Sequence, residues 1–269
     1  MGNGAGPVTT SDRLLEHLVN TRLAGSVATS IDSCLTNCER FARGDPDTTF
    51  GLSDWTELSY EDAVAIMASC GVGLADTPAD EHQRRQPAFI QPEVALEAVH
   101  RHAQILADLA AARARVLLAT GHAFALLAHY GAIARALEGA GCVLLRPLEG
   151  QRDALRTPSG KRAAVRYLDG VGTLAYHGAL HHTHRPEYME VMLDALGGPG
   201  GVDAVIADHG FAGVAVEAGI QTLSIADAND PGLPIAQARG RTDGVLLIDD
   251  GLNPSVYEPV TAAMLAWRR

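Results

Sequence analysis

The chain has 269 residues, of which 47% are hydrophobic and 20% charged, and its formal net charge is −11. This composition can bury a core without disulfides and excludes global disorder. The acidic balance argues against a nucleic-acid partner or an anionic membrane surface. No run approaches the roughly 20 apolar residues that a membrane span needs, and residues 1–12 lack the features of a secretory signal. We therefore expect a cytoplasmic protein with neither kind of partner.

Residues 1–112 have a helical, loop-rich pattern. Ser11 or Asp12 can cap a first helix whose apolar positions run over 14–19. A second helix is predicted over 60–70, and the segment 71–92 is predicted to be a loop. A long helix is predicted to begin at Pro92, since proline is favoured at the first position of a helix. We predict a helical amino-terminal region over 1–112 that packs on the rest. The four scattered cysteines are interpreted as ordinary buried thiols.

Residues 113–269 alternate short apolar runs with helical segments. Consecutive apolar residues are typical of strands covered on both faces, as in parallel sheets. The runs lie at 116–119, 142–145, 163–168, 172–176, 204–207, 222–225 and 245–248. Helices are predicted at 123–139, 186–196, 211–218 and 256–267, and Asp169-Gly170 predicts a hairpin between the third and fourth runs. The predicted fold is therefore an α/β, three-layer, Rossmann-like domain with a mostly parallel sheet that carries the site.

Polar groups follow five of the predicted strands. Ligands of open α/β sheets bind beyond the carboxyl ends of the strands, so these groups are expected to converge. They include six of the eleven histidines and lie at 120–122, 177–184, 208–210, 227–231 and 249–251. For the last of these segments we favour a simple turn, and the segment 227–231 has the composition of a turn as well.

The histidines and carboxylates of these segments predict a metal site. His182 and His184, two residues apart in an extended segment, present their rings on one side. Mixed imidazole and carboxylate ligation suits a divalent ion such as zinc, manganese, iron or magnesium. The candidate ligands are His177, His182, His184, Asp208, His209 and Asp227. The alternative for any one ring is a hydrogen bond to the backbone or a place in an exposed loop.

Other residues predict a phosphate contact. Thr120, Gly121 and His122 begin a helix after the first apolar run, where backbone amides and the helix dipole favour an anion. His122 is a candidate general acid or simply a helix cap. The guanidinium of Arg22 can donate two parallel hydrogen bonds to a phosphate. Lys161 is the one lysine of the chain. It lies in a basic loop at 156–162 that either closes on phosphate or is solvated.

Several familiar motifs are absent from the sequence. It contains no Gly-x-Gly-x-x-Gly and no P-loop, so a dinucleotide or ATP site is unsupported. It contains no Gly-x-Ser-x-Gly nucleophile elbow either, which argues against a serine hydrolase of that type.

Taken together, the segments 119–122, 177–184, 207–210 and 226–231, with 21–29 near the amino terminus, resemble an actinobacterial phosphatase-like family over most of the chain. Some members belong to natural-product pathways, including those of nucleoside antibiotics. The resemblance implies a phosphatase acting on a sugar or nucleoside phosphate. Segment 150–165 has no match in it.

These observations predict a metal-dependent phosphomonoesterase of a small phosphorylated metabolite, with a homo-oligomer as one option. Metal would activate water, and His122 or Asp230 would protonate the leaving alkoxide, with Asp208 also catalytic. The phosphate contacts would be Arg22, Thr120, Gly121 and Lys161. The alternatives are a lyase, isomerase or carbon–nitrogen hydrolase that uses the same metal, and a non-catalytic module that binds a nucleotide or sugar phosphate.

Overall fold

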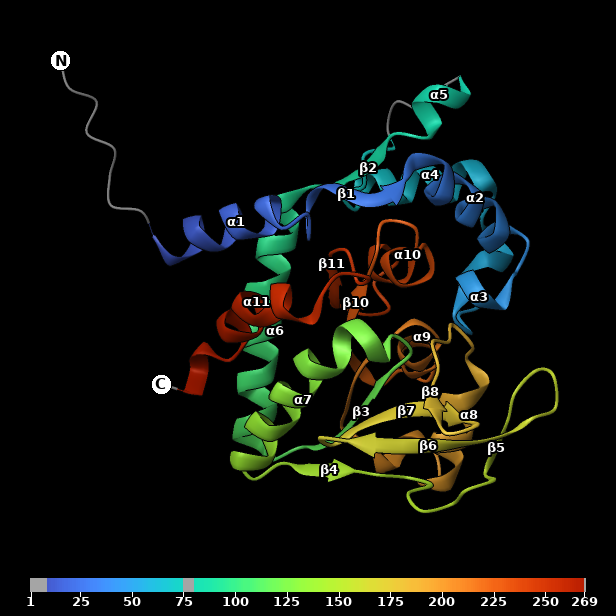
Figure 1. Cartoon of the computed structure of the whole chain (residues 1–269), viewed down its shortest axis with the longest axis vertical. Helices are drawn as coiled ribbons and strands as arrows, with labels where there is room; N and C mark the ends of the chain where they lie inside the picture. Colours follow the sequence, from blue (N-terminus) through green and yellow to red (C-terminus); the bar gives the residue numbers. More distant parts are fainter. Residues whose placement is uncertain (1–8, 75–79, 269) are drawn as a thin grey trace.

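A computed structural model of the chain describes residues 9–74 and 80–268 and shows a mixed α/β fold around a mostly parallel sheet. The central sheet has nine strands in the main order β11-β10-β9-β3-β7-β6-β5 (Figure 1). Its main parallel strands are β3 (Arg115–Thr120), β7 (Val171–Tyr176), β9 (Ala204–Asp208), β10 (Gln221–Ala226) and β11 (Gly244–Leu247). The predicted α/β class and the mostly parallel sheet are confirmed.

One side of the sheet carries the short strand β4 (Val143–Leu145), which runs parallel to β3. The antiparallel strands on this side are β5 (Leu155–Arg156), β6 (Arg162–Leu168) and β8 (Ala179–Leu180). The predicted hairpin is confirmed, because β6 pairs antiparallel with β7. β4 pairs with the first half of β3 and β7 with its second half, so both lie along the same side of β3.

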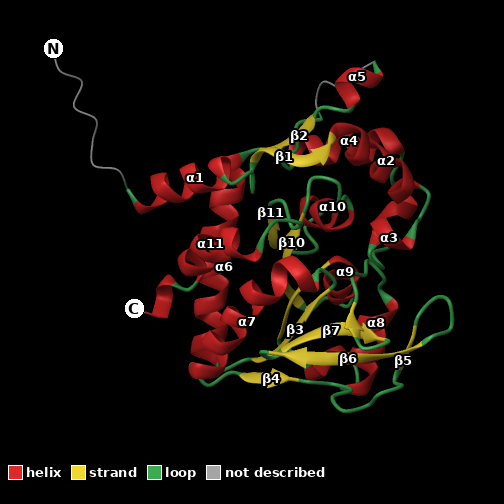
Figure 2. Ribbon diagram, in the orientation of Figure 1, coloured by secondary structure: helices red, strands yellow, loops and turns green. Residues whose placement is uncertain are grey.

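Helices cover the sheet, as Figure 2 shows in red. α6 packs on β11, α7 on β3 and β7, and α9 on β9 and β10. Their bounds are α6 (Pro92–Ala112), α7 (Ala123–Gly139), α8 (Glu187–Ala195), α9 (His209–Glu217), α10 (Gly232–Ala238) and α11 (Glu258–Met264). α9 begins two residues before its predicted start, and α10 was not predicted. The helix predicted at 256–267 is present but shorter: α11 is flanked by the 3-10 turns η3 (Pro254–Tyr257) and η4 (Ala266–Arg268), and Pro259, which needs no amide partner, lies in its first turn.

The amino-terminal region contains more regular structure than its sequence predicted. β1 and β2 form a separate antiparallel pair, and the predicted loop at 71–92 is wrong where it contains α5 and β2. The elements are α1 (Thr10–Asn20), β1 (Gly25–Ser30), α2 (Ile31–Ala42), α3 (Pro46–Thr49), η1 (Asp54–Glu57), α4 (Tyr60–Ser69), α5 (Glu81–Arg84) and β2 (Pro87–Ile90). Thr9, rather than Ser11 or Asp12, caps α1, and Asp12 closes the capping box. Residues 1–8 of the predicted non-signal segment, and 75–79 of the predicted loop, lie outside the described residues.

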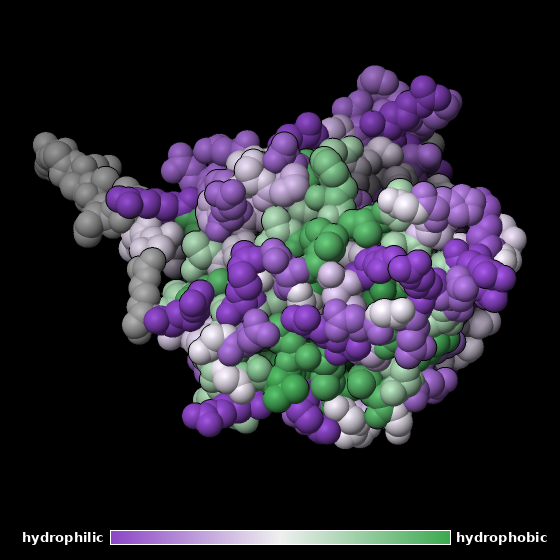
Figure 3. Space-filling view, turned by 60° about the horizontal axis from the view of Figure 1, so that its bottom comes forward, coloured by the Kyte–Doolittle hydropathy of each residue, from purple (hydrophilic) through white to green (hydrophobic). Residues whose placement is uncertain are grey.

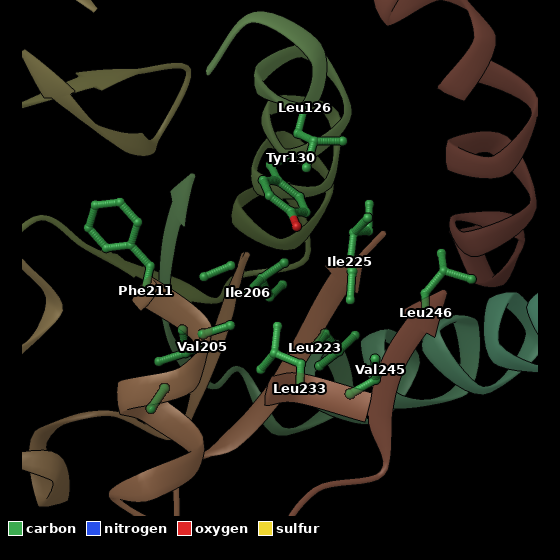
Figure 4. Packing of buried hydrophobic residues seen from close by; sticks show 14 of the residues in the cluster. Leu126, Tyr130, Val205, Ile206, Phe211, Leu223, Ile225, Leu233, Val245 and Leu246 are labelled. Carbon is green, nitrogen blue, oxygen red and sulfur yellow. The ribbon is translucent and has the colours of Figure 1, made fainter. Parts of the chain in front are cut away.

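The core explains why the strands are apolar on consecutive residues. Side chains of β9, β10 and β11 meet those of α7, α9 and α10 (Figure 4). Every residue of β9 and of β11 is buried, because both faces of the sheet are covered. The four cysteines are free thiols, three of them buried and Cys70 half-buried, and burial raises the pKa of Cys38 to about 12.

In the view of Figure 3, hydrophilic residues cover much of the face, with apolar areas between them. Among the described residues, no helix combines the length and the apolar character that crossing a membrane requires.

A buried histidine in α6 is expected to make the free energy of unfolding depend on pH. His102 of α6 is 4% exposed and donates from Nε2 to the Gly244 carbonyl at 2.8 Å. Burial lowers the pKa of His102 from 6.5 to about 4, with the Gly244 hydrogen bond opposing the shift. As pH falls from 6.5 towards 4, the unfolded chain binds a proton that the folded chain does not, so folding loses stability.

We expect this histidine to account for roughly 3 kcal/mol of the decrease in unfolding free energy between pH 7 and pH 4. His102→Gln, which keeps a donor for Gly244, should flatten the decrease, as measured by urea unfolding at several pH values. The exposed neighbour on the same helix provides the control, since His100→Gln should leave the profile unchanged. Equal profiles for all three proteins would contradict the assignment.

Candidate functional site

His209 lies at the centre of the polar groups that follow the strands. It is the first residue of α9, directly after β9, and it adopts a left-handed backbone conformation with φ of 46°. The ring is 2% exposed: Nδ1 lies 3.0 Å from Asp208 Oδ1, and Nε2 lies 3.1 Å from Asp250 Oδ2 and 3.5 Å from Asp230 Oδ2. Burial lowers the pKa of His209, but the three carboxylates outweigh it and raise the pKa well above its usual value.

Asp208, at the end of β9, is fixed by the segment after β3. Thr120 Oγ1 donates to Asp208 Oδ2 at 2.5 Å, and the Gly121 amide donates to Oδ1 at 2.6 Å. Burial alone would raise the pKa of this carboxyl, but the hydrogen bonds from His209, Thr120 and Gly121 lower it overall. Thr120 and Gly121, which were predicted to contact phosphate, thus hold the carboxylate that orients His209.

The remaining carboxylates come from the ends of β10 and β11. The Asp227 amide donates to Asp230 Oδ2 at 3.0 Å, and the Thr29 hydroxyl donates to Asp227 Oδ2. Burial and the charges of Asp250 and Asp230 raise the pKa of Asp227 well above its usual range. Burial also acts to raise the pKa of Asp230, but the charge of His209 and its hydrogen bond lower it overall. Oδ1 of Asp227 is buried and has no hydrogen-bond partner among the described residues.

Two histidines of the segment 177–184 join this cluster. The His184 ring stacks on His209 with centroids 4.1 Å apart, and its Nδ1 donates to the Asp47 carbonyl at 2.9 Å. The His182 ring lies 4.7 Å from His184 and 4.5 Å from His122, centroid to centroid. Desolvation, together with the charges of the neighbouring rings, lowers the pKa of His182 to about 3, and desolvation also lowers the pKa of His184. Both rings are neutral at pH 7 and able to act as ligands.

The cluster contains two sets of three side chains whose ligand atoms all lie within 4.8 Å of one another. One set is His182, His184 and His209, and the other is His209, Asp230 and Asp250. His209 belongs to both sets. Its Nδ1 faces Asp208, so Nε2, which faces Asp230 and Asp250, is the nitrogen that could share a metal with those carboxylates. The sequence interpretation missed Asp250, which we favoured as part of a turn. Its position directly beyond a buried strand was the signal that could have identified it.

A cavity of about 570 Å³ opens beside the histidines. Its lining includes His182, His184 and two cations, Arg40 of α2 and Arg185. Arg40 Nε lies 2.9 Å from Asp45 Oδ2, and Arg185 Nε lies 3.0 Å from Glu187 Oε1. Thr157 and Pro158 of the predicted basic loop line the cavity as well. Sequence reasoning missed both arginines: Arg40 follows no strand of the sheet, and Arg185 lies one residue beyond the predicted polar segment 177–184.

Asp208 and Asp227, which were predicted as ligands, are in neither ligand set but lie in the same cluster. Three other predicted site residues have no contact with the cluster around His209 in the described structure. His177 is exposed in the turn between β7 and β8 and lines a different cavity of about 390 Å³. Lys161 is exposed, with its Nζ 5.8 Å from the centroid of the Tyr176 ring. Arg22 donates from Nε to the Ser26 carbonyl at 3.0 Å and from Nη2 to the Val27 carbonyl at 2.8 Å. Its guanidinium therefore braces the start of β1.

Comparison with known proteins gives two matches. A sequence profile of the family described as "Phosphatase" matches residues 9–268. The chain is also 38% identical, over 256 residues, to a curated protein of Streptomyces coelicolor that is named a phosphatase. This match covers 94% of each chain, and the residues matched by the family profile include the segments that build the site.

Proposed function

The chain belongs to the Phosphatase family, and from this membership we propose that it is a metal-dependent phosphomonoesterase of a small phosphorylated metabolite. The observation that carries the proposal is the array of neutral histidines and carboxylates around His209, next to a cavity that two arginines line. We also assign the sheet and its covering helices to the three-layer, Rossmann-like class, in which ligands bind at this edge.

The donor set fits a divalent ion such as zinc, manganese, iron or magnesium. We assign His182, His184, His209, Asp230 and Asp250 as its ligands, and a second ion is compatible with the two sets that share His209. Asp208 orients the ring of His209 from behind, as carboxylates commonly do for metal-binding histidines. When bound, the ion lowers the pKa of water and neutralises charge on phosphoryl oxygens. The unpartnered Oδ1 of Asp227 supports a cation nearby.

The protein's own groups would bind the phosphate and move a proton. Arg40 and Arg185 supply planar, permanently charged forks on the wall of the cavity, well suited to a phosphate group. Their present carboxylate partners, Asp45 and Glu187, would be replaced by phosphate oxygens. His122 lies against His182, and its buried Nδ1 has no hydrogen-bond partner among the described residues. We assign it to protonate the leaving alkoxide.

Removal of metal tests this function directly. Phosphate release from p-nitrophenyl phosphate, glucose 6-phosphate and a nucleoside monophosphate is measured before and after chelation and dialysis. We expect at least about a tenfold loss, because the metal supplies both water activation and charge neutralisation, and recovery when Zn²⁺ or Mn²⁺ is added back. Elemental analysis of the same samples reports the metal content.

The possible outcomes separate the two parts of the proposal. Full activity in protein shown to be metal-free would contradict the metal role and leave a phosphatase. The absence of phosphate release from all three substrates, in metal-loaded protein, would contradict the phosphomonoesterase itself.

A further inference from the structure

A second cavity, of about 400 Å³, opens on another side of His182. It is lined by His122, Ala123, Phe124, Leu180, His181 and His182. His182 therefore lines both this cavity and the cavity that contains Arg40 and Arg185. The two cavities meet at the same candidate ligand.

The two cavities differ in charge. The first contains two arginines, whereas none of the six residues that line the second has a permanent charge. His181 is already occupied, because its ring stacks on Tyr176 and its Nε2 donates to the Tyr176 carbonyl at 3.1 Å. A charged group would find no counter-ion in the second cavity.

Two large apolar side chains that line this cavity are exposed to solvent. Phe124, at the start of α7, is 75% exposed, and Leu180 of β8 is 38% exposed. Exposed apolar side chains that gather beside a polar site are typical of a ligand-binding wall. Each would gain free energy by contact with an apolar group of a ligand.

We propose that Phe124 and Leu180 bind an aromatic or similarly apolar leaving group of the substrate, while its phosphate lies between Arg40 and Arg185. This inference rests on the proposed phosphomonoesterase. In the reaction, the oxygen of water bonds to phosphorus and the phosphorus–oxygen bond to the leaving group breaks, with its electron pair passing to the leaving oxygen. That oxygen takes a proton from His122, which regains one from water, so ester and water give alcohol and inorganic phosphate. His122 lines the second cavity, where this oxygen would emerge.

Benzyl phosphate and ethyl phosphate test the inference, because they release primary alcohols of similar acidity that differ in the ring. The readout is the ratio of kcat/KM for benzyl phosphate to kcat/KM for ethyl phosphate, measured in the metal-loaded protein. In Phe124→Ala we expect this ratio to fall about tenfold, and in Leu180→Ala by several-fold, since each loses an apolar contact that only the ring makes. Val143→Ala is the control, because Val143 of β4 is 53% exposed and lines neither cavity.

The outcomes are distinguishable. An unchanged ratio in both variants, or an equal loss for both substrates, would overturn the inference and leave the phosphomonoesterase standing. If the unmodified protein hydrolyses neither ester, the inference is overturned, and the proposed function is overturned with it only when the three substrates of the metal-removal experiment release no phosphate either. Thermal unfolding shows whether the variants are folded. We expect both to be folded, because the two side chains that they truncate are exposed.

Discussion

Asp230→Asn is expected to lower kcat/KM for a phosphomonoester by at least about 100-fold, because a neutral amide replaces a carboxylate that we assign as a metal ligand. The carboxylate is 2% exposed and lies 3.5 Å from His209 Nε2, so little solvent is available to take over its role. Steady-state kinetics measures the loss. Elemental analysis of the purified variant should show reduced metal content alongside it.

The control for this change is Asp194→Asn. Asp194 lies in α8 on the protein surface, so the same loss of one negative charge there should leave kcat/KM unchanged. Circular dichroism establishes that both variants are folded. A folded Asp230→Asn variant with unimpaired kcat/KM would remove Asp230 from the site.

Gly121→Ala is expected to destabilise the fold by about 3 kcal/mol and to abolish activity. A Cβ at this position would lie 2.1 Å from the Thr183 carbonyl oxygen and 3.1 Å from Asp208 Oδ1. The carbonyl belongs to the backbone, so it cannot move aside as a flexible side chain does. The Gly121 amide also donates to Asp208, so displacement of this segment would disturb the carboxylate that orients His209. Urea unfolding and steady-state kinetics measure the two effects.

Gly139→Ala is the matched control, because a Cβ there meets nothing within 4 Å. Gly139 ends α7, the helix that begins two residues after Gly121, and alanine should stabilise it by up to about 1 kcal/mol through its helix propensity. If Gly121→Ala is as stable and active as Gly139→Ala, the close packing of this segment is not what holds the site.

The sequence predicted the sheet better than it predicted the amino-terminal region. Runs such as 116–119 and 204–207 are apolar on successive residues, a signal that arises from burial of both strand faces and needs no knowledge of the neighbours. The strands β1 and β2 are short and lie outside the central sheet, and β1 has an exposed or half-exposed residue at most of its positions. Their pattern is therefore not distinguishable from that of a loop.

The edge of the sheet where the candidate site lies was also predicted from sequence. Asp208, His209 and Asp230 follow strands, and the rule that parallel strands present their carboxyl ends on one edge brings them together. The same rule applies to Asp250, but we interpreted the segment 249–251 as a simple turn and did not include Asp250 among the site residues. Arg40 and Asp47 follow no strand of the sheet; they reach the cavity because α2 and α3 fold over from a region more than 130 residues away from His184.

The sequence by itself determined the apolar pattern of the sheet and the order in which polar segments follow its strands, because both are set by local residue periodicity. The tertiary structure decided which polar side chains of those segments face one another. His184 stacks on His209, whereas His177, seven residues earlier, is exposed in a turn with φ of 50°. Arg22, which precedes β1, donates to two carbonyls of β1, and Asp208 accepts hydrogen bonds from the Thr120 hydroxyl and the Gly121 amide. Backbone direction and long-range hydrogen bonds fix these choices, and neither is encoded in the spacing of residues along the chain.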